Sequence, residues 1–152
     1  MALNTPQLKT DLEDLFANAD LDPTVLASQW QTVLATWAKT VLPATVPATV
    51  DAAAAALSGQ LIPIFSSTGD PASKGAAMDA AFQTFALGVG GAMAPAFVGT
   101  PPASPPGFVA GLAAQPVPDT HADAADVWGT KFHDWFITGI ATPPVGPVVP
   151  WS

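Results

Sequence analysis

The chain of 152 residues contains no cysteine, no tyrosine and no arginine, and only 11% of its residues are charged. The absence of cysteine excludes disulfide bonds, thiolate nucleophiles and thiolate metal ligands. The net charge of −8 at pH 7 leaves no cationic patch of the kind that phosphate backbones require, so we expect no nucleic-acid partner. An ordinary soluble domain is about 25% charged, so the shortage of charge is itself a feature to explain.

Residues suited to catalysis or metal binding are also scarce. The two histidines, His121 and His133, would lie about 18 Å apart on one helix, which is too far to share a metal ion. Glu13 is the only glutamate, and most aspartates lie at predicted helix starts, where the helix dipole explains them. No serine lies in a GxSxG frame, and no glycine-rich loop has phosphate-binding spacing. We therefore predict that the protein is not an enzyme and has no catalytic residues, metal site or cofactor.

The residues that are abundant favour a folded helical domain. The chain has 17 prolines, 12 glycines, 5 tryptophans and 8 phenylalanines, and 49% of its residues are hydrophobic. One domain of this length buries enough surface to be stable without disulfides. We predict an all-α fold, a small bundle of four to five helices with long Pro/Gly-rich irregular segments and an extended C-terminal tail. The helical domain would cover residues 1–140, with a Pro-rich insert at 94–118, and the tail residues 141–152.

Several predicted helices begin with a capping residue directly before proline. Proline is tolerated in the first helical turn, and a Thr or Asp before it can accept hydrogen bonds from the free backbone amides. The starts are Thr5-Pro6, Asp22-Pro23, Thr49, Asp70-Pro71 and Thr120, and the helices that follow cover residues 6–17, 23–41, 50–62, 71 to about 93 and 121 to about 138.

Two irregular segments combine proline with an absence of charge. No residue from 80 to 118 is charged, and four prolines occur among the last twelve residues. Because proline lacks a backbone N–H, we expect residues 141–152 to form neither a helix nor a central strand. Trp151 has two competing roles: it docks within its own chain, or it inserts into a partner, since tryptophan is enriched at interface hot spots. The candidate interface residues of the two segments are Phe97, Val98, Pro101, Pro102, Phe108, Pro144, Val148, Val149 and Trp151.

The uncharged stretch at residues 80–99 is as long as a membrane span. It contains Gln83, Thr84, Pro95 and four glycines, and it has no flanking Lys or Arg to orient it. We therefore expect a buried helix followed by an apolar loop, without membrane insertion.

Two functional hypotheses from different classes remain open at this point. In the first, the chain is an assembly subunit, because interface cores are poor in charge and rich in Trp, Phe and Met. In the second, it is a helical module that binds a small apolar ligand in a pocket lined by Phe82, Phe85, Trp128 and Trp135.

The segments AMAPAFVGTPPASPPGF, THADAADVW and PVVPWS give residues 92–152 an Ala/Pro-rich character. In this character the chain resembles small virion structural proteins of tailed bacteriophages. The resemblance implies a structural subunit made in the host cytoplasm and found in the virion, in the tail, baseplate or neck, with a capsid decoration or cement protein as the alternative. Its partners would be other virion proteins and copies of itself. The resemblance carries no signature motif and transfers no functional residues.

Overall fold

The protein is described here by a computed structural model covering residues 3–107 and 118–152. It is mostly helical, as predicted, but a small sheet accompanies the helices, so the expectation of an all-α fold is correct only in part. The elements are α1 (Thr5–Ala17), α2 (Pro23–Ala38), α3 (Pro47–Ser66), α4 (Pro71–Gly91), β1 (Val98–Thr100), α6 (His121–Phe136), β2 (Ile140–Thr142) and β3 (Val149–Pro150).

The predicted caps are present at three of the five helices. Asp22, Asp70 and Thr120 each accept a backbone N–H from the first turn of α2, α4 and α6. Two predicted starts are wrong. The cap of α1 is Asn4, which accepts from the backbone of Gln7 and leaves Thr5 as the first helical residue. The start of α3 lies at Pro47, before Thr49 and without a side-chain cap.

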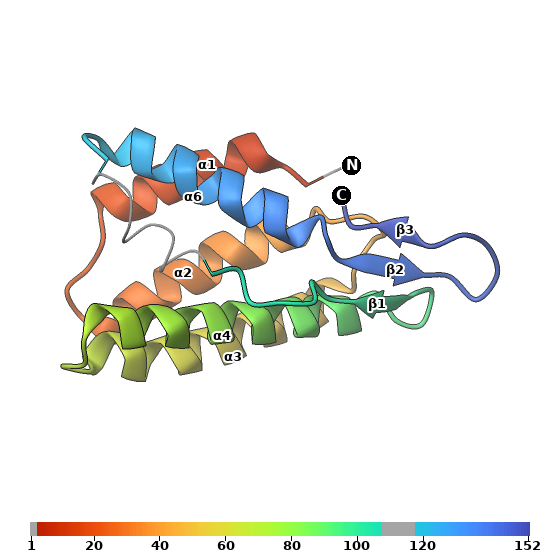
Figure 1. Cartoon of the computed structure of the whole chain (residues 1–152), viewed down its shortest axis with the longest axis horizontal. Coiled ribbons are helices and arrows are strands. Elements are labelled where there is room, and N and C mark those ends of the chain that lie inside the picture. The colour runs from red at the N-terminus through yellow and green to blue at the C-terminus, as the bar shows by residue number, and fades with distance from the viewer. Residues whose placement is uncertain (1–2, 108–117) are drawn as a thin grey trace.

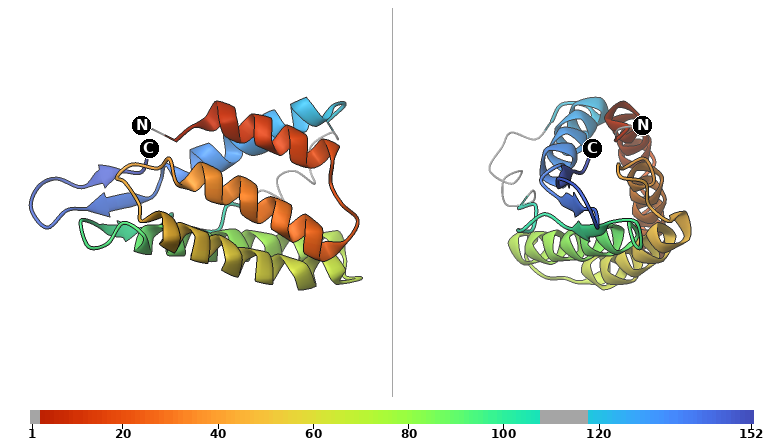
Figure 2. Two further views of the ribbon diagram at one scale, coloured as in Figure 1. Left: turned by 180° about the vertical axis from the view of Figure 1, so that it is seen from behind. Right: turned by 90° about the vertical axis from the view of Figure 1, so that its right-hand side faces the viewer.

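Four of the helices form two antiparallel pairs, and α2 lies between the pairs. Helix α1 packs along α6, α3 packs along α4, and α2 packs mainly on α3 and less extensively on α1. Figure 1 shows the α1 and α6 pair on one side of the molecule and the α3 and α4 pair on the other, with α2 between them. The end view in Figure 2 shows the helices arranged around a common interior. The apolar faces of the helices therefore share one core.

Aromatic side chains fill the centre of this core. The ring of Trp30 on α2 lies 5.4 Å from that of Trp128 on α6 and 5.7 Å from that of Phe82 on α4. Phe132 completes the group, with its ring centre 4.9 Å from that of Phe82. Aromatic pairs at such separations add stabilisation beyond the area they bury. Helices α2 and α6 thus present tryptophans to one another across a shared core.

Close backbone approach explains how α3 and α4 pack side by side. A Cβ added at Gly88 of α4 would lie 2.5 Å from the Cβ of Ala53 on α3. Only glycine fits this crossing, and an alanine-rich partner keeps the two helices near each other. Helix α3 also continues through Pro63 to Ser66, so its predicted end at residue 62 is wrong.

The three strands form one antiparallel sheet in the order β1-β2-β3. Val98 pairs with Thr142, and Ala141 pairs with Val149. Residues 141–142 therefore lie in the central strand, which corrects the expectation that the C-terminal segment forms none. The prolines follow only after Thr142, and Pro150 lies in the edge strand β3, where a missing N–H is tolerated.

Among the described residues, α3 is long and apolar enough to cross a membrane, although only 28% of its most apolar window is buried. Its buried residues Val50, Ala54, Leu57 and Leu61 belong to the hydrophobic core.

Candidate interaction surface

The sheet and the loops around it form one end of the molecule, which extends beyond the helices (Figure 1). We define this sheet end as residues 40–46, 94–100 and 139–152. None of these residues has a charged side chain. The sheet end thus combines three segments that are distant in sequence and equally free of charge.

Exposed aliphatic side chains gather on the sheet end. Val145 at the tip of the β2–β3 hairpin is 91% exposed, and Val98 on β1 is 71% exposed. The set consists of Leu42, Val46, Val98, Ile140, Val145, Val148 and Val149. Elsewhere in the described residues, the exposed large hydrophobic side chains are Leu21, Val25 and Leu87. Single exposed aliphatics are ordinary, whereas several on one uncharged end indicate an interaction site.

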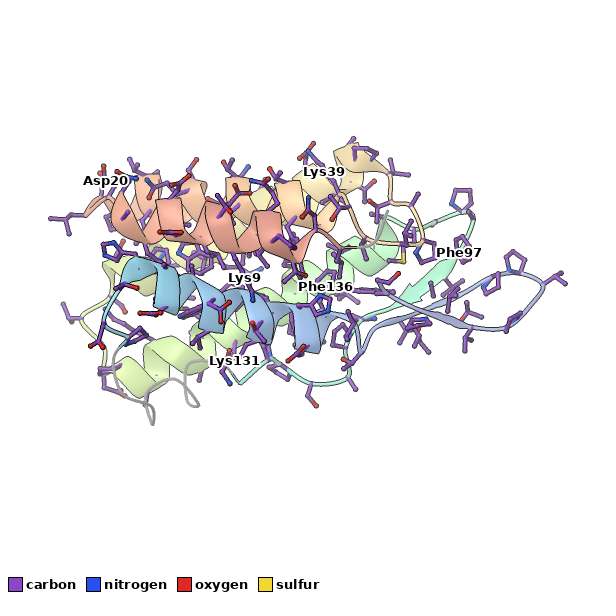
Figure 3. All side chains as sticks on the ribbon, turned by 90° about the horizontal axis from the view of Figure 1, so that it is seen from above. Lys9, Asp20, Lys39, Phe97, Lys131 and Phe136 are labelled. Atoms are coloured by element: carbon purple, nitrogen blue, oxygen red, sulfur yellow. The ribbon has the colours of Figure 1, made fainter. Side chains whose placement is uncertain are left out.

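Charged side chains lie on the helical body instead. Figure 3 shows Lys9, Asp20, Lys39 and Lys131 along this body, while the hairpin extends away from them. The ion pair of Lys39 with Asp51, 2.5 Å long, marks the border of the sheet end at α2 and α3. The charge of the chain and its exposed apolar side chains are therefore separated in space.

Trp151 anchors the sheet end to the core. Its side chain is fully buried, and its ring centre lies 5.0 Å from that of Phe136. A Cβ added at Gly139 would lie 2.5 Å from the ring, and one at Gly90 would lie 3.3 Å from it. We call this space, bounded by Gly90, Phe136 and Gly139, the Trp151 pocket. The two glycines thus leave space for the indole ring, and the ring of Phe136 packs against it.

Backbone hydrogen bonds hold the same segment from both sides. The N–H of Trp151 donates to the carbonyl of Gly139 at 2.9 Å. On the side of β3 that faces away from β2, the backbones of Leu42 and Ser152 exchange two hydrogen bonds. The N–H of Leu42 donates at 2.6 Å and the N–H of Ser152 donates at 3.2 Å. Because Pro150 has no N–H, this edge offers few donors to a further strand. A partner would therefore meet the sheet end through side chains rather than by extending the sheet at β3.

The predicted interface residues divide into three groups. Val98, Pro144, Val148 and Val149 are exposed on the sheet end, while Phe97 and Pro101 are half-buried. Trp151 and Pro102 are buried within the chain itself, so neither is displayed on the sheet end, and for Trp151 this is the docking within its own chain. Trp151 fills its own pocket, and the carbonyl of Pro102 accepts a 2.6 Å hydrogen bond from Gln83 Nε2. Phe108 lies outside the described residues.

Four exposed residues of the sheet end are absent from the sequence-based hypothesis, namely Leu42, Val46, Ile140 and Val145. Val145 stands between prolines in a segment without charge, a pattern that could have identified it. Leu42 and Val46 lie about a hundred residues away in sequence. Their membership depends on the pairing of Leu42 with Ser152, which no local pattern reveals.

The four residues predicted to line a ligand pocket do not line one together: Trp128 lines an open pocket of about 610 Å³ at the start of α6, and the other three are not part of its lining. Phe82 and Phe85 are buried in the core. Trp128 packs on Trp30, and the indole N–H of Trp135 donates to the carbonyl of Ser104 at 2.8 Å. These side chains are therefore structural parts of the bundle.

An open groove of about 770 Å³ lies elsewhere, between α1 and α2. Asp11 and Asp14 line its α1 side, and Thr24, Ser28 and Thr36 line its α2 side. Aliphatic side chains of both helices line it as well, so its walls mix apolar groups with carboxylates and hydroxyls, and the groove is open rather than enclosed as the ligand hypothesis requires.

Titratable groups serve helix ends and contacts between helices. The hydroxyl and backbone N–H of Ser73 donate to the carboxylate of Asp70 and hold its pKa below its ordinary value. His133 Nδ1 lies 2.8 Å from the hydroxyl of Thr5, which joins α6 to α1. Within residues 3–107 and 118–152, no three His, Asp or Glu side chains are grouped so that they could hold a metal ion.

Comparison of the chain with models of protein families, with curated proteins and with solved structures finds no match.

Proposed function

We propose that the protein is a non-enzymatic structural subunit of a larger protein assembly and that it contacts neighbouring subunits through the sheet end. One observation carries the proposal: seven exposed aliphatic side chains share an end of the molecule without a charged residue. A soluble monomer ordinarily covers such an end with charge. In an assembly, a neighbour covers it.

The size of the hydrophobic effect supports this assignment. Fully burying one aliphatic side chain contributes about 1.5–3 kcal/mol. Association costs about 4–15 kcal/mol in lost translational and rotational freedom. The seven side chains are between 37% and 91% exposed, so covering all of them buries the equivalent of about four full side chains and contributes about 6–11 kcal/mol, which lies within this range.

The assembly that we propose is the virion of a tailed bacteriophage. Support comes from the Ala/Pro-rich character of residues 92–152, which contribute β1, β2 and β3 to the sheet end. Within a virion, the tail, baseplate or neck is the first choice, and a capsid decoration or cement role is the second. Other virion proteins and further copies of the chain would be the partners.

Particle composition tests this proposal. Particles from cells that make the protein are purified by density-gradient centrifugation, and the chain is quantified in them by mass spectrometry. We expect a fixed ratio of the chain to the capsid or tail proteins. Recovery of the chain only in the soluble fraction would refute the proposal.

A pair of variants localises the contact. Val145→Asp with Val148→Asp places two charges on the sheet end, and Leu21→Asp with Leu87→Asp places two charges elsewhere at exposed positions. Both variants have the same net charge. We expect the first to be lost from particles and the second to be incorporated normally, and equal incorporation would argue against the sheet end.

A further inference from the structure

The segment that fills the Trp151 pocket is joined to the rest of the fold by one exposed loop. Residues 143–148 connect β2 to β3, and Val145 and Val148 in this loop are 91% and 55% exposed. Gly90, Phe136 and Gly139, which bound the pocket, all precede the loop. An identical segment from a second copy could therefore make every contact that residues 149–152 make within their own chain.

The closed form of the loop depends on one residue. Pro143, Pro144 and Pro147 each fix φ near −65°, which favours an extended chain. Gly146 has φ +121°, a conformation that is essentially restricted to glycine. The loop therefore contains three residues that favour extension and one that permits the return.

We propose that β3 and Trp151 exchange between two copies of the chain, so that each copy fills the Trp151 pocket of the other. This inference rests on the proposed function and specifies one partner, a second copy. Exchange restores all contacts of the closed form, so the balance between the forms is set by the loop and by the new surface that the dimer buries. The extended loop of six residues spans about 20 Å, which is sufficient to bridge two sheet ends.

The distribution of charge favours association of two copies through their sheet ends. Each copy has a net charge of −8, so contact through the helical bodies brings like charges together. Contact through the sheet ends keeps the charged bodies apart and joins the exposed valines of both copies. The exchanged segment and the apolar surface thus lie at the same end.

Introduced cysteine pairs test the exchange, since the chain has no cysteine of its own. Ala141→Cys with Val149→Cys places thiols on paired residues of β2 and β3. Val98→Cys with Thr142→Cys places thiols on paired residues of β1 and β2, both of which precede the loop. Paired antiparallel strands have the Cα separation that a disulfide needs.

Oxidation at high protein concentration should give disulfide-linked dimers of the first pair on a non-reducing gel and only monomers of the control pair. Monomers of both pairs at every concentration would overturn the proposal. So would dimers of both pairs in equal yield, because these would report random encounters.

A second variant acts on the loop alone. Gly146→Ala strains the closed turn and thereby favours exchange. We expect the association constant of the dimer, measured by sedimentation equilibrium, to rise about tenfold or more. Gly69→Ala is the control, because Gly69 lies in another loop without a positive φ and a Cβ there makes an ordinary contact at 3.7 Å. An unchanged or lower constant for a folded Gly146→Ala protein would overturn the exchange.

The outcomes separate the two proposals. If the cysteine pair closes only within one chain while particles still contain the protein, exchange is refuted and the proposed function stands. If exchanged dimers form but no particle contains the chain, the proposed function is refuted and exchange stands.

Discussion

At the scale of single residues, Trp151 joins parts of the chain that are far apart in sequence. Its ring contacts Phe136, and its position leaves space for no side chain at Gly139. The neighbouring Ser152 bonds with Leu42 at the start of the chain's second quarter. The last residues thereby fix the α2–α3 loop and the end of α6 relative to one another.

Trp151→Ala tests this role. Removal of a buried tryptophan costs about 3–5 kcal/mol of the free energy of unfolding, which is a large part of the 5–15 kcal/mol typical of a domain. The measurement is urea denaturation followed by circular dichroism. Val145→Ala is the control, since this side chain is exposed and its loss changes stability by less than about 0.5 kcal/mol. Equal stability of the two variants would show that Trp151 is not an anchor.

Asp70 offers a test based on its pKa. Chiefly because the hydroxyl of Ser73 donates to its carboxylate, the pKa lies below the ordinary value of 3.8. Because the pKa is lowered in the folded state, the ionised carboxylate stabilises the fold when the pH is above the ordinary pKa. This stabilisation is lost as the pH falls through the lowered pKa. Ser73→Ala should raise the pKa of Asp70 toward 3.8, as measured by carboxyl NMR titration. A pKa that does not move would assign the shift to the backbone amides instead.

At the scale of elements, the α3 and α4 pair depends on the glycine at its crossing. Gly88→Ala brings a Cβ to 2.5 Å from the Cβ of Ala53, so the helices must move apart. Overpacking of this kind costs about 1–3 kcal/mol. Gly91→Ala on the same helix meets no atom within 4 Å and should be neutral or stabilising by up to about 1 kcal/mol. Thermal unfolding should separate the two variants, and a Gly88→Ala protein as stable as wild type would contradict the close crossing.

The helices could be predicted because their determinants are local. Asp22 and Asp70 stand directly before proline, and both act as predicted. Pro63 shows the limit of such reasoning, because packing of Leu57 and Leu61 into the core keeps α3 helical around it. The strands have only two or three residues, which is too few for a periodicity to indicate them, and β1 pairs with a strand about forty residues further along the chain.

The candidate surface was predictable in composition but not in membership. The absence of charge in residues 94–100 and 139–152 is visible in the sequence and led to the choice of Val98, Val148 and Val149 as candidates, and the structure places all three among the exposed residues. The location of Trp151 was not visible, because it depends on space left by Gly90 and Gly139 after folding. A tryptophan near a chain end fits a partner and its own core equally well until that space is known.

At the scale of the whole molecule, a net charge of −8 opposes contact between copies while the uncharged sheet end favours it. The longest helix, α4, has 21 residues and spans about 30 Å, so the centres of the helical bodies of two copies joined at their sheet ends lie more than about 30 Å apart. The Debye length falls from about 30 Å at 0.01 M salt to about 10 Å at 0.1 M. Salt therefore screens most of the repulsion at this distance without weakening an apolar contact.

We therefore expect self-association to strengthen with salt, by about tenfold between 0.01 M and 0.1 M at pH 7. Sedimentation velocity over a range of protein concentrations measures this change. The variant with Val145→Asp and Val148→Asp should associate less at both salt concentrations, because its added charges lie within the contact. The variant with Leu21→Asp and Leu87→Asp has the same net charge as this first variant but should associate nearly as strongly as wild type at 0.1 M salt, with a somewhat larger salt response because each copy carries two more negative charges. Association that weakens with salt would indicate a contact made by opposite charges, which would place it on the helical body.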